Sequence, residues 1–288
     1  MKRTERASLA KQTLDILNKG FYMAPGSGDR VGLADEMAQA IAGTTLHTPD
    51  GLDDLLSRVL ATDAPYDTPA TLELAVETTL EAIVRVAAQE PGASVMALNF
   101  ASAKNPGGGF LGGSQAQEES LARSSGLYPT LKSQPGYYTF HRALRTALYS
   151  DHMIHSPQVP VIRDDQGGLL ESPVQVSFIT AAAVNAGVVR RRDKSEARKI
   201  REVMVTRAAK MMALAAEKGH DVLILGAWGC GVFRNDPQEI ASVFGEVLGA
   251  GYGMEMCFRR VIFAIPKFGK KDHNAETFAK GLALQVPT

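Results

Sequence analysis

Hydrophobic residues recur at helical spacing through much of the first ninety residues of this chain. The first stripe, which Gly20 closes, consists of Leu9, Thr13, Ile16 and Leu17. Residues 44–70 are rich in Thr, Pro, Asp and Gly, and they predict a connection with one short helix near Leu52 to Leu60. A stronger helix is expected from Pro69 to the breakers at 91–92. These residues therefore predict a mainly helical section.

After residue 90 the pattern changes to short apolar runs that alternate with helical stripes. The apolar runs predict buried strands at 94–100, 173–183, 221–225 and 260–265. Helices are expected from about Gln117, over 195–218 and over 236–248. Strands that alternate with helices are typical of a largely parallel sheet covered on both faces, so we expect an α/β fold.

Two polar motifs follow the first expected strand. The run Asn105–Gly109 ends in a triple glycine, and Gln117–Glu119 follows after a seven-residue spacer. Three glycines present backbone N–H groups with no side chain in the way, which suits a diphosphate or a ribose. A carboxylic acid nearby can supply the proton that breaking a glycosidic bond requires. Together the motifs indicate hydrolysis of a sugar–nucleotide linkage.

The two acids also have a simpler explanation. Carboxylates are common in the first turn of a helix because they complement its dipole. Ser114 and Gln117 also have the spacing of a capping box. Adjacent helical residues point roughly 100° apart, so Glu118 and Glu119 cannot perform one task together. The triple glycine at this spacing favours the catalytic interpretation.

A second glycine loop follows the strand expected at 221–225. The segment Gly226–Gly231 carries three glycines, and Asp236 and Pro237 have the N-cap and first-turn residues of a helix. A strand, a glycine loop and a helix in this order form a phosphate-binding arrangement. The loop has neither the Rossmann nor the Walker pattern, which argues against NAD binding and ATP hydrolysis.

The triple glycine, its spacer and Gln117–Glu119 closely resemble the signature of poly(ADP-ribose) glycohydrolases, and residues 99–114 are similar to the bacterial branch of that family. Residues 10–22 are similar to the family's opening helix, and 226–236 match a further motif, so the resemblance spans nearly the whole chain. It implies a macrodomain-like three-layer α/β/α sandwich with a mixed, largely parallel sheet. Its expected parts are an N-terminal helical extension (1–90) and a catalytic core (91–288).

The resemblance also implies an activity: cleavage of ribose–ribose glycosidic bonds in poly(ADP-ribose), releasing ADP-ribose, with no metal and no cofactor. Glu119 is then the expected general acid and base, and Glu118 with Gln117 is expected to hold ribose hydroxyls. The remaining residues expected to contact substrate are Asn99, Ser102, Asn105, Gly107, Gly108, Gly109, Gly229, Cys230, Gly231, Val232, Phe233 and Phe268.

Several assignments keep an alternative. The usual second asparagine of macrodomains falls on Ser102, so either Ser102 or Asn105 holds the distal ribose. Phe233 is either a wall of the ribose pocket or a core aromatic, and Phe268 either stacks on adenine or packs. Two rival functions are a module that only binds ADP-ribose and an enzyme that removes single ADP-ribosyl groups. The intact acid pair argues against the first, since a pure binding module needs no acid.

The composition of the chain limits the classes of partner that it is expected to bind. The 288 residues have a formal net charge of zero, so no global attraction to nucleic acid or anionic membrane is expected. No apolar run approaches the ~20 residues of a membrane span, and the start resembles no signal peptide. The two cysteines fit a reducing cytosol. We expect a cytoplasmic protein whose partners are poly(ADP-ribose), ADP-ribose and ADP-ribosylated proteins, without direct nucleic-acid or membrane binding.

Three further features favour ordinary roles. His152 and His155 form an H-x-x-H pair without an accompanying Cys or His cluster, so zinc is not expected. The run Arg190–Arg192 begins a charged stretch that two acids interrupt, which favours a solvated face over a polymer-binding patch. Cys230 has no base partner nearby in sequence, which indicates a small packing residue rather than a nucleophile.

Overall fold

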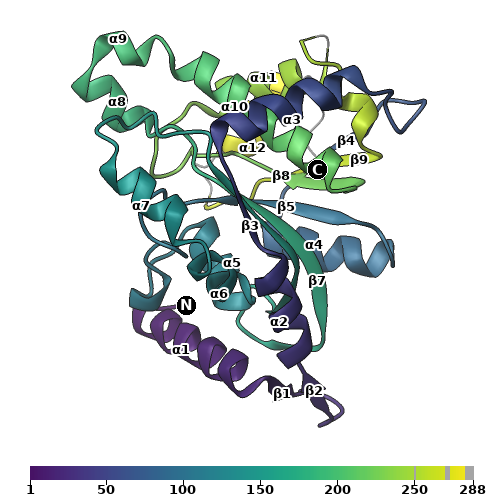
Figure 1. Ribbon diagram of the computed structural model, residues 1–288. Helices are drawn as coiled ribbons and strands as arrows, with labels where there is room; N and C mark the ends of the chain where they lie inside the picture. The colour runs from purple at the N-terminus through teal and green to yellow at the C-terminus, as the bar shows by residue number, and fades with distance from the viewer. Residues whose placement is uncertain (250, 270–272, 283–288) are drawn as a thin grey trace.

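The computed structural model describes residues 1–249, 251–269 and 273–282, and its centre is a seven-stranded sheet (Figure 1). The strands are β3 (Thr45–His47), β4 (Thr71–Ala75), β5 (Val95–Phe100), β6 (Met153–Arg163), β7 (Leu169–Ala181), β8 (Val222–Leu225) and β9 (Arg260–Ala264). Their order in the sheet is β3-β6-β7-β5-β8-β9-β4. β7, β5, β8, β9 and β4 are parallel, whereas β6 is antiparallel to β3 and β7. The predicted mixed, largely parallel sheet is confirmed.

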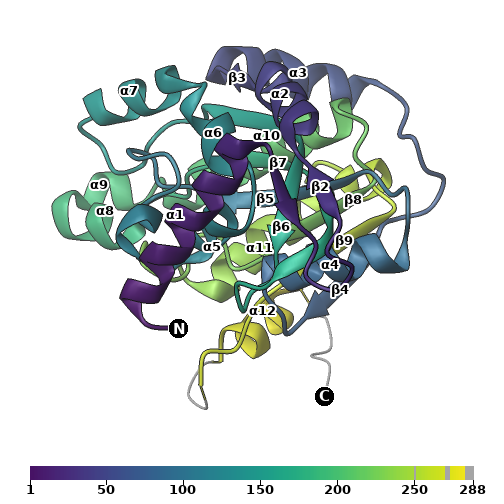
Figure 2. The same cartoon turned by 90° about the horizontal axis from the view of Figure 1, so that it is seen from below.

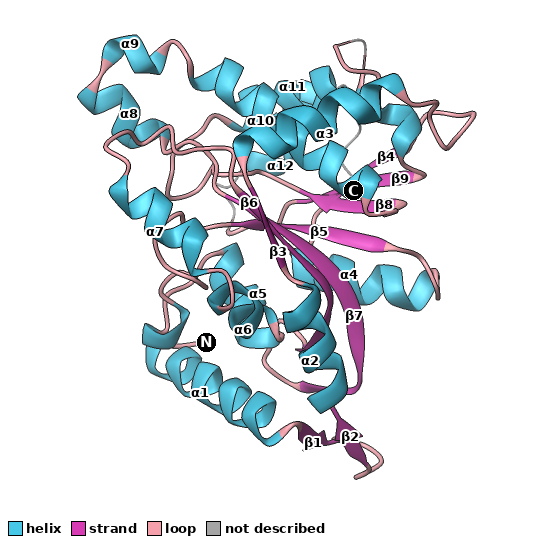
Figure 3. Cartoon of the chain, in the orientation of Figure 1, coloured by secondary structure: helices cyan, strands magenta, loops and turns pink. Residues whose placement is uncertain are grey.

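Helices cover both faces of this sheet (Figure 3). One layer contains α3 (Pro49–Ala61), α10 (Ile200–Glu217), α11 (Pro237–Leu248) and α12 (Asn274–Leu282), and the other contains α2 (Ala34–Gly43), α4 (Thr79–Gln89), α5 (Gln117–Ser124), α6 (Leu127–Lys132) and α7 (Pro135–Ala143). Along β5, Met96 and Leu98 pack in the first core and Ala97 in the second, because successive strand side chains point to opposite faces. The result is the expected α/β/α sandwich.

Helix α1 (Arg3–Lys19) lies outside the sandwich and packs across α5 and the short helix η1 (Phe110–Gly112), as Figure 2 shows from below. A small core of Ala10, Phe110 and Ala122 joins them. Gly20 ends α1 in the left-handed conformation (φ 73°), as the sequence predicts. A hairpin of β1 (Phe21–Met23) and β2 (Arg30–Gly32) follows.

The expected boundary at residue 90 does not separate a helical extension from the sheet. Strands β3 and β4 both lie before it, yet they form the two edges of the sheet. Thr45 pairs with His155 of β6, and Thr71 pairs with Arg260 of β9. The first ninety residues therefore complete the sheet as well as covering it. Short edge strands carry little hydrophobic pattern, so the sequence did not reveal them.

The helix expected from Pro69 begins later. Thr71–Ala75 is strand β4, and α4 starts only at Thr79. A capping box sets that start: Thr78 Oγ1 accepts the N–H of Glu81 at 3.1 Å, and the Glu81 carboxylate accepts the N–H of Thr78 at 2.8 Å. The residues of β4 suit either element, and parallel pairing with β9 decides for a strand.

Two other regions differ from prediction. Strand β6 was not predicted, and it forms a long hairpin with β7. The helix expected over 195–218 begins at Ile200, after two short helices, α8 (Ala186–Arg192) and α9 (Lys194–Ala197). Asp193 separates them because its carboxylate caps α9, accepting the N–H of Ser195 at 2.7 Å. Within the described ranges, no helix is both long and apolar enough to cross a membrane.

Candidate active site

The carboxyl ends of β5, β7 and β8 lie together at one edge of the sheet, and both glycine loops leave from this edge (Figure 1). Phe100 at the end of β5 pairs with Ala181 at the end of β7. The indole N–H of Trp228 donates to the Ala181 carbonyl at 3.2 Å, which fastens the second loop to β7. In open α/β sheets this edge is where ligands bind.

Glu118 is buried at this edge, with only 3% of its surface exposed. Its carboxylate accepts the backbone N–H of Ser102 at 2.6 Å and the side-chain amide of Asn99 at 3.3 Å. Burial raises the pKa of Glu118 to about 8, although these two donors favour the charged form. Glu118 is therefore a fixed carboxyl group that readily holds a proton at neutral pH.

Glu119, the next residue, is partly exposed and has a different environment. Its Oε1 accepts the backbone N–H of Gly109 at 3.0 Å. The 100° turn between neighbouring helical residues thus sends one acid inward and the other to the loop, as expected. Of the two, Glu119 is the more accessible carboxyl group.

The triple glycine is not the open phosphate cradle that we expected. The N–H groups of Gly107 and Gly109 hydrogen-bond to Glu118 and Glu119, and that of Gly108 donates to the Asn105 carbonyl at 3.0 Å. Gly107 and Gly108 have positive φ angles of 67° and 58°. The glycines instead let this loop run directly against the two carboxylates, where a side chain would collide.

Gln117 and Asn99 lie beside the acids, and their contact with a ligand stays a prediction. Gln117 accepts the N–H of Phe100 at 2.9 Å and donates to the Leu98 carbonyl at 2.7 Å, which fixes the start of α5 against β5. Asn99 is fully buried and bridges Glu118 and Thr180. Both side chains help to position the acids, while the buried Oδ1 of Asn99 has no hydrogen-bond partner among the described residues.

The start of α5 is not capped by Ser114. The N-cap residue is Ala116, and its side chain makes no capping hydrogen bond. The Ser114 carbonyl instead accepts the Arg123 guanidinium at 2.7 Å. Glu118 and Glu119 are thus first-turn residues of a helix without a side-chain cap, and their carboxylates point to the loop.

Ser102 and Asn105 occupy different positions in the first loop. The Ser102 hydroxyl accepts the N–H of Asn105 at 3.2 Å and that of Lys104 at 3.4 Å, so it stabilises a turn within the loop. The Asn105 side chain is exposed. Of the two, Asn105 is the residue whose side chain lies open to a ligand.

The second loop has three consecutive unpaired donors. Among the described residues, no protein acceptor meets the backbone N–H groups of Gly231, Val232 and Phe233. Val232 is 80% exposed, and Gly229 (φ 73°) packs so closely on Asn235 that a side chain would not fit. Asn235, which sequence reasoning missed, holds the loop by donating to the Val184 carbonyl at 2.8 Å.

Phe233 and Cys230 both pack at the edge of the core. Phe233 is partly buried against it, and its ring lies 5.9 Å from that of Tyr149. Cys230 also packs against this core, and burial raises the pKa of its thiol. A high pKa disfavours the nucleophilic thiolate, in agreement with its predicted role as a small residue.

Sequence reasoning missed three residues near the acids. Arg123, one turn after Glu119 on α5, holds residues 114–115 beside the site; the spacing of four was a usable signal. Tyr137 and Tyr138 on α7 are buried, with ring centroids 4.9 Å apart. Burial and the nearby charge of Glu118 raise the pKa of both hydroxyls. This aromatic pair helps to keep water from Glu118.

The two histidines of the H-x-x-H pair do not converge. His152 hydrogen-bonds to Ser150 at 2.9 Å, and His155 lies 3.3 Å from His220. The described part of the chain contains no group of three or more His, Cys, Asp or Glu placed to hold a metal ion. Phe268 is 74% exposed beyond β9, and its choice between stacking and packing stays a prediction.

Comparisons with known proteins agree with this geometry. The family model for the microbial-type PARG catalytic domain matches residues 10–164. Poly(ADP-ribose) glycohydrolase from Thermomonospora curvata is 45% identical, with a TM-score of 0.91, and the match covers 96% of this chain and 99% of that one. A second T. curvata structure, bound to the inhibitor ADP-HPD, is 44% identical with a TM-score of 0.88 over the same shares of both chains.

The Deinococcus radiodurans enzyme in complex with ADP-ribose is 42% identical with a TM-score of 0.79, and the match covers 85% of this chain and 96% of that one. A comparison with curated protein sequences gave no match. The sequence signature, the acids at the sheet edge and these similarities lead to one conclusion. The chain belongs to the microbial-type poly(ADP-ribose) glycohydrolase family.

Proposed function

We propose that this chain cleaves the ribose–ribose glycosidic bonds of poly(ADP-ribose), with Glu119 as general acid and then general base. The observation that carries the assignment is the contrast between two adjacent carboxyl groups. Glu118 is buried and held by three donors, from Asn99, Ser102 and Gly107, whereas Glu119 is accessible and held by the N–H of Gly109. An accessible carboxyl group can exchange a proton with a substrate and then with water.

The reaction needs two proton transfers, one from Glu119 and one back to it. Glu119 donates its proton to the leaving ribose oxygen as the bond from that oxygen to the anomeric carbon breaks. The carboxylate then takes a proton from the water that attacks the anomeric carbon, which restores the acid and yields ADP-ribose. With one acid in the catalytic position, the two-carboxylate scheme of ordinary glycosidases does not apply directly.

The other site residues have supporting roles in this proposal. Glu118, with its raised pKa, holds a ribose hydroxyl and is itself positioned by Asn99 and the N–H of Ser102. The exposed side chain of Asn105 contacts the distal ribose. The unpaired N–H groups of Gly231, Val232 and Phe233 bind the diphosphate, because consecutive backbone donors favour an anion.

The similar structures support this choice of ligand, since one holds ADP-ribose and another the inhibitor ADP-HPD. We extend the substrates to polymer attached to proteins. The two cysteines, both free, support a reducing compartment, so a cytoplasmic location is part of the proposal.

The test compares Glu119→Gln with Glu118→Gln. Glutamine keeps size and hydrogen bonding but loses the acid, so Glu119→Gln should lower kcat ~10²–10⁴-fold while ADP-ribose still binds. Glu118→Gln should chiefly raise KM, because it misplaces the ribose. Calorimetry measures the binding of ADP-ribose by each variant, and single-turnover release from polymer measures the rate of cleavage. Near-normal hydrolysis by Glu119→Gln would overturn the assignment.

The same assay separates the rival activity. Polymer and a protein that carries a single ADP-ribosyl group are offered at equal total concentrations of bound ADP-ribose units. Preferential release from the polymer supports a glycohydrolase. Faster release from the singly modified protein would favour a mono-ADP-ribosyl hydrolase.

A further inference from the structure

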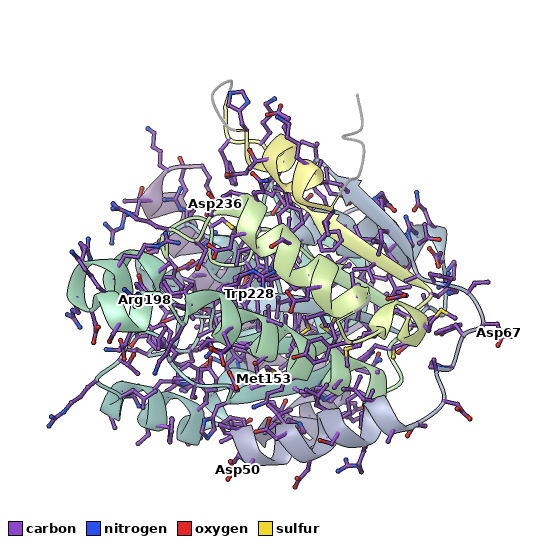
Figure 4. The ribbon with its side chains drawn as sticks, turned by 90° about the horizontal axis from the view of Figure 1, so that it is seen from above. Asp50, Asp67, Met153, Arg198, Trp228 and Asp236 are labelled. Atoms are coloured by element: carbon purple, nitrogen blue, oxygen red, sulfur yellow. The ribbon has the colours of Figure 1, made fainter. Side chains whose placement is uncertain are left out.

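The zero net charge of the chain conceals a strongly basic patch. Nine exposed cationic side chains gather on the α8–α9 arm, the end of α7 and the second loop: Arg142, Arg145, Arg190, Arg191, Arg192, Lys194, Arg198, Lys199 and Arg234. Three acids, Asp193, Glu196 and Glu239, lie among them, so nine cations and three acids give the patch a formal charge of +6. Figure 4 shows Arg198 on this arm, at the opposite side of the molecule from Asp67.

The patch is poorly neutralised by the protein itself. Of the nine cations, Arg190 alone lies within salt-bridge distance of a carboxylate in the described residues, at 3.5 Å from Glu239. Such a contact between exposed groups is weak. A concentration of unpaired positive charge attracts a polyanion and releases its counterions on binding.

The basic patch, defined by those nine residues, adjoins the second loop of the active site. The N–H of Gly187 at the start of α8 donates to the Phe233 carbonyl at 2.9 Å, and the Arg190 guanidinium donates to the Arg234 carbonyl at 3.2 Å. On its other side, the N–H of Asn185 donates to the Ala147 carbonyl at 3.0 Å. A chain whose last unit occupies the active site can therefore continue across α8.

A hollow of about 420 Å³ lies within the patch. Arg145 and Arg192 line it together with two carboxylates, Asp193 and Glu196, with Ala147 and the nearly buried Val189 as apolar surface and Thr146 as a hydroxyl. The Asp193 carboxylate is engaged in capping α9, and the surrounding cations outnumber the two acids. Guanidinium groups bind phosphate oxygens in a two-pronged manner and stack on flat bases. An apolar surface between two such groups suits a nucleotide, which combines a diphosphate with a flat adenine. The hollow is within the size range of small-molecule sites.

We propose that this hollow is a second, non-catalytic site for another ADP-ribose unit of the polymer whose terminal unit occupies the active site. The inference rests on the proposed function and deepens it, since the hollow selects long polymer over short. It replaces the expectation that Arg190–Arg192 are only a solvated face. Single-stranded nucleic acid has similar charge, but continuity with the substrate loop favours poly(ADP-ribose).

The test measures binding separately from turnover, in the Glu119→Gln background. Arg145→Gln/Arg192→Gln removes the two guanidinium groups that line the hollow; neither side chain makes a hydrogen bond or ion pair within the described residues, so folding should be retained. The matched control is Arg58→Gln/Lys218→Gln. Arg58 pairs with Glu217 at the far end of α10, which at 18 residues is about 27 Å long.

Dissociation constants are measured for free ADP-ribose and for long poly(ADP-ribose) at 50 and 200 mM salt. Each phosphate contact on a single strand releases ~0.7 counterions. Between 50 and 200 mM salt, the polymer affinity of the double variant should therefore fall by a factor about sevenfold smaller than that of the parent, because two contacts are lost. The control should behave like the parent, and ADP-ribose affinity should be the same in all three proteins. Arg145→Glu/Arg192→Glu should weaken polymer binding further.

Two results would overturn the proposal. One is a double variant whose polymer affinity and salt dependence match those of the control. The other is single-stranded DNA of equal length that competes as well as polymer, which would make the patch a nucleic-acid surface. Release of ADP-ribose during the binding assay would instead show that Glu119 is misassigned. That result would contradict the proposed function, but the comparison of the double variant with its control would still test the second site.

Discussion

Glu119 lies directly against Gly108: a Cβ atom added to Gly108 would come within 2.9 Å of the Glu119 carboxyl carbon. The glycine also has a φ of 58°, which other residues adopt at a cost of about 1–2 kcal/mol. The conformation of the loop and the position of the acid therefore depend on the same absent side chain.

Gly108→Ala should consequently impair catalysis more than folding. Displacing Glu119 by about 1 Å should lower kcat ~10²-fold, while stability falls by about 1–2 kcal/mol. Gly112→Ala in the same loop is the control, because its Cβ would meet its nearest neighbour, Arg3, at an ordinary 3.8 Å. Turnover and thermal unfolding should be measured for both. Equal turnover in the two variants would contradict this role of Gly108.

The buried Glu118 makes stability depend on pH. Its pKa is raised to about 8, chiefly by burial, from 4.5. Between these values the folded protein holds the proton and the unfolded chain does not, so stability falls as pH rises from about 4.5 to 8. Glu118→Gln cannot lose this proton. The unfolding free energy of Glu118→Gln, relative to that of the wild type, should therefore increase by up to a few kcal/mol as the pH rises from about 4.5 to 8.

Urea unfolding of both proteins at pH 5 and pH 8.5 checks this, since other titrating groups are common to the pair. A difference that stays constant between the two pH values would mean that Glu118 is ionised in the folded protein. The activity of Glu118→Gln does not enter the comparison.

His155 and His220 should make the protein sensitive to acid. Their rings share a 3.3 Å contact, and burial lowers the pKa of His155 to about 3 and that of His220 to about 4. His47 and Lys218 oppose a further positive charge there, whereas Asp221 favours it. Below the ordinary value of 6.5 the unfolded chain binds protons that the folded protein excludes. Stability is therefore lost as pH falls from 6.5 towards 4.

Each histidine should contribute about 1.4 kcal/mol per pH unit to this loss. His155→Gln should remove one such contribution, so its stability should fall less steeply than that of the wild type. His273→Gln, which changes a histidine with a 68% exposed side chain, is the control. Parallel curves for the wild type and His155→Gln between pH 6.5 and 4 would count against burial of a neutral imidazole.

Hydrolysis should not require a divalent metal ion. His152 and His155 contact different partners, and the proposed reaction assigns both proton transfers to Glu119. Activity on polymer should therefore persist after exhaustive treatment with a chelator. Loss of activity that one specific ion restores would redirect attention to the histidines.

Local signals in the sequence determined much of the fold. Gly20 ends α1, Asp236 caps α11, and the buried runs around β5, β8 and β9 are strands, as predicted. These features depend on neighbouring residues: a cap satisfies donors two or three positions away, and a buried strand needs a continuous apolar run. The helix that carries the acid pair begins at Gln117, as predicted, because a strand, a glycine loop and a helix follow one another directly.

Only the tertiary structure decided which polar groups bond to the protein and which stay exposed. Asn99 meets Thr180, and Gln117 meets Thr79, across separations that no local pattern encodes. These contacts fix both side chains beside Glu118 and Glu119, and their contact with substrate stays a prediction. The edge strands and the basic patch likewise depend on segments distant in the chain, since pairing and summed charge follow position in space rather than order in the sequence.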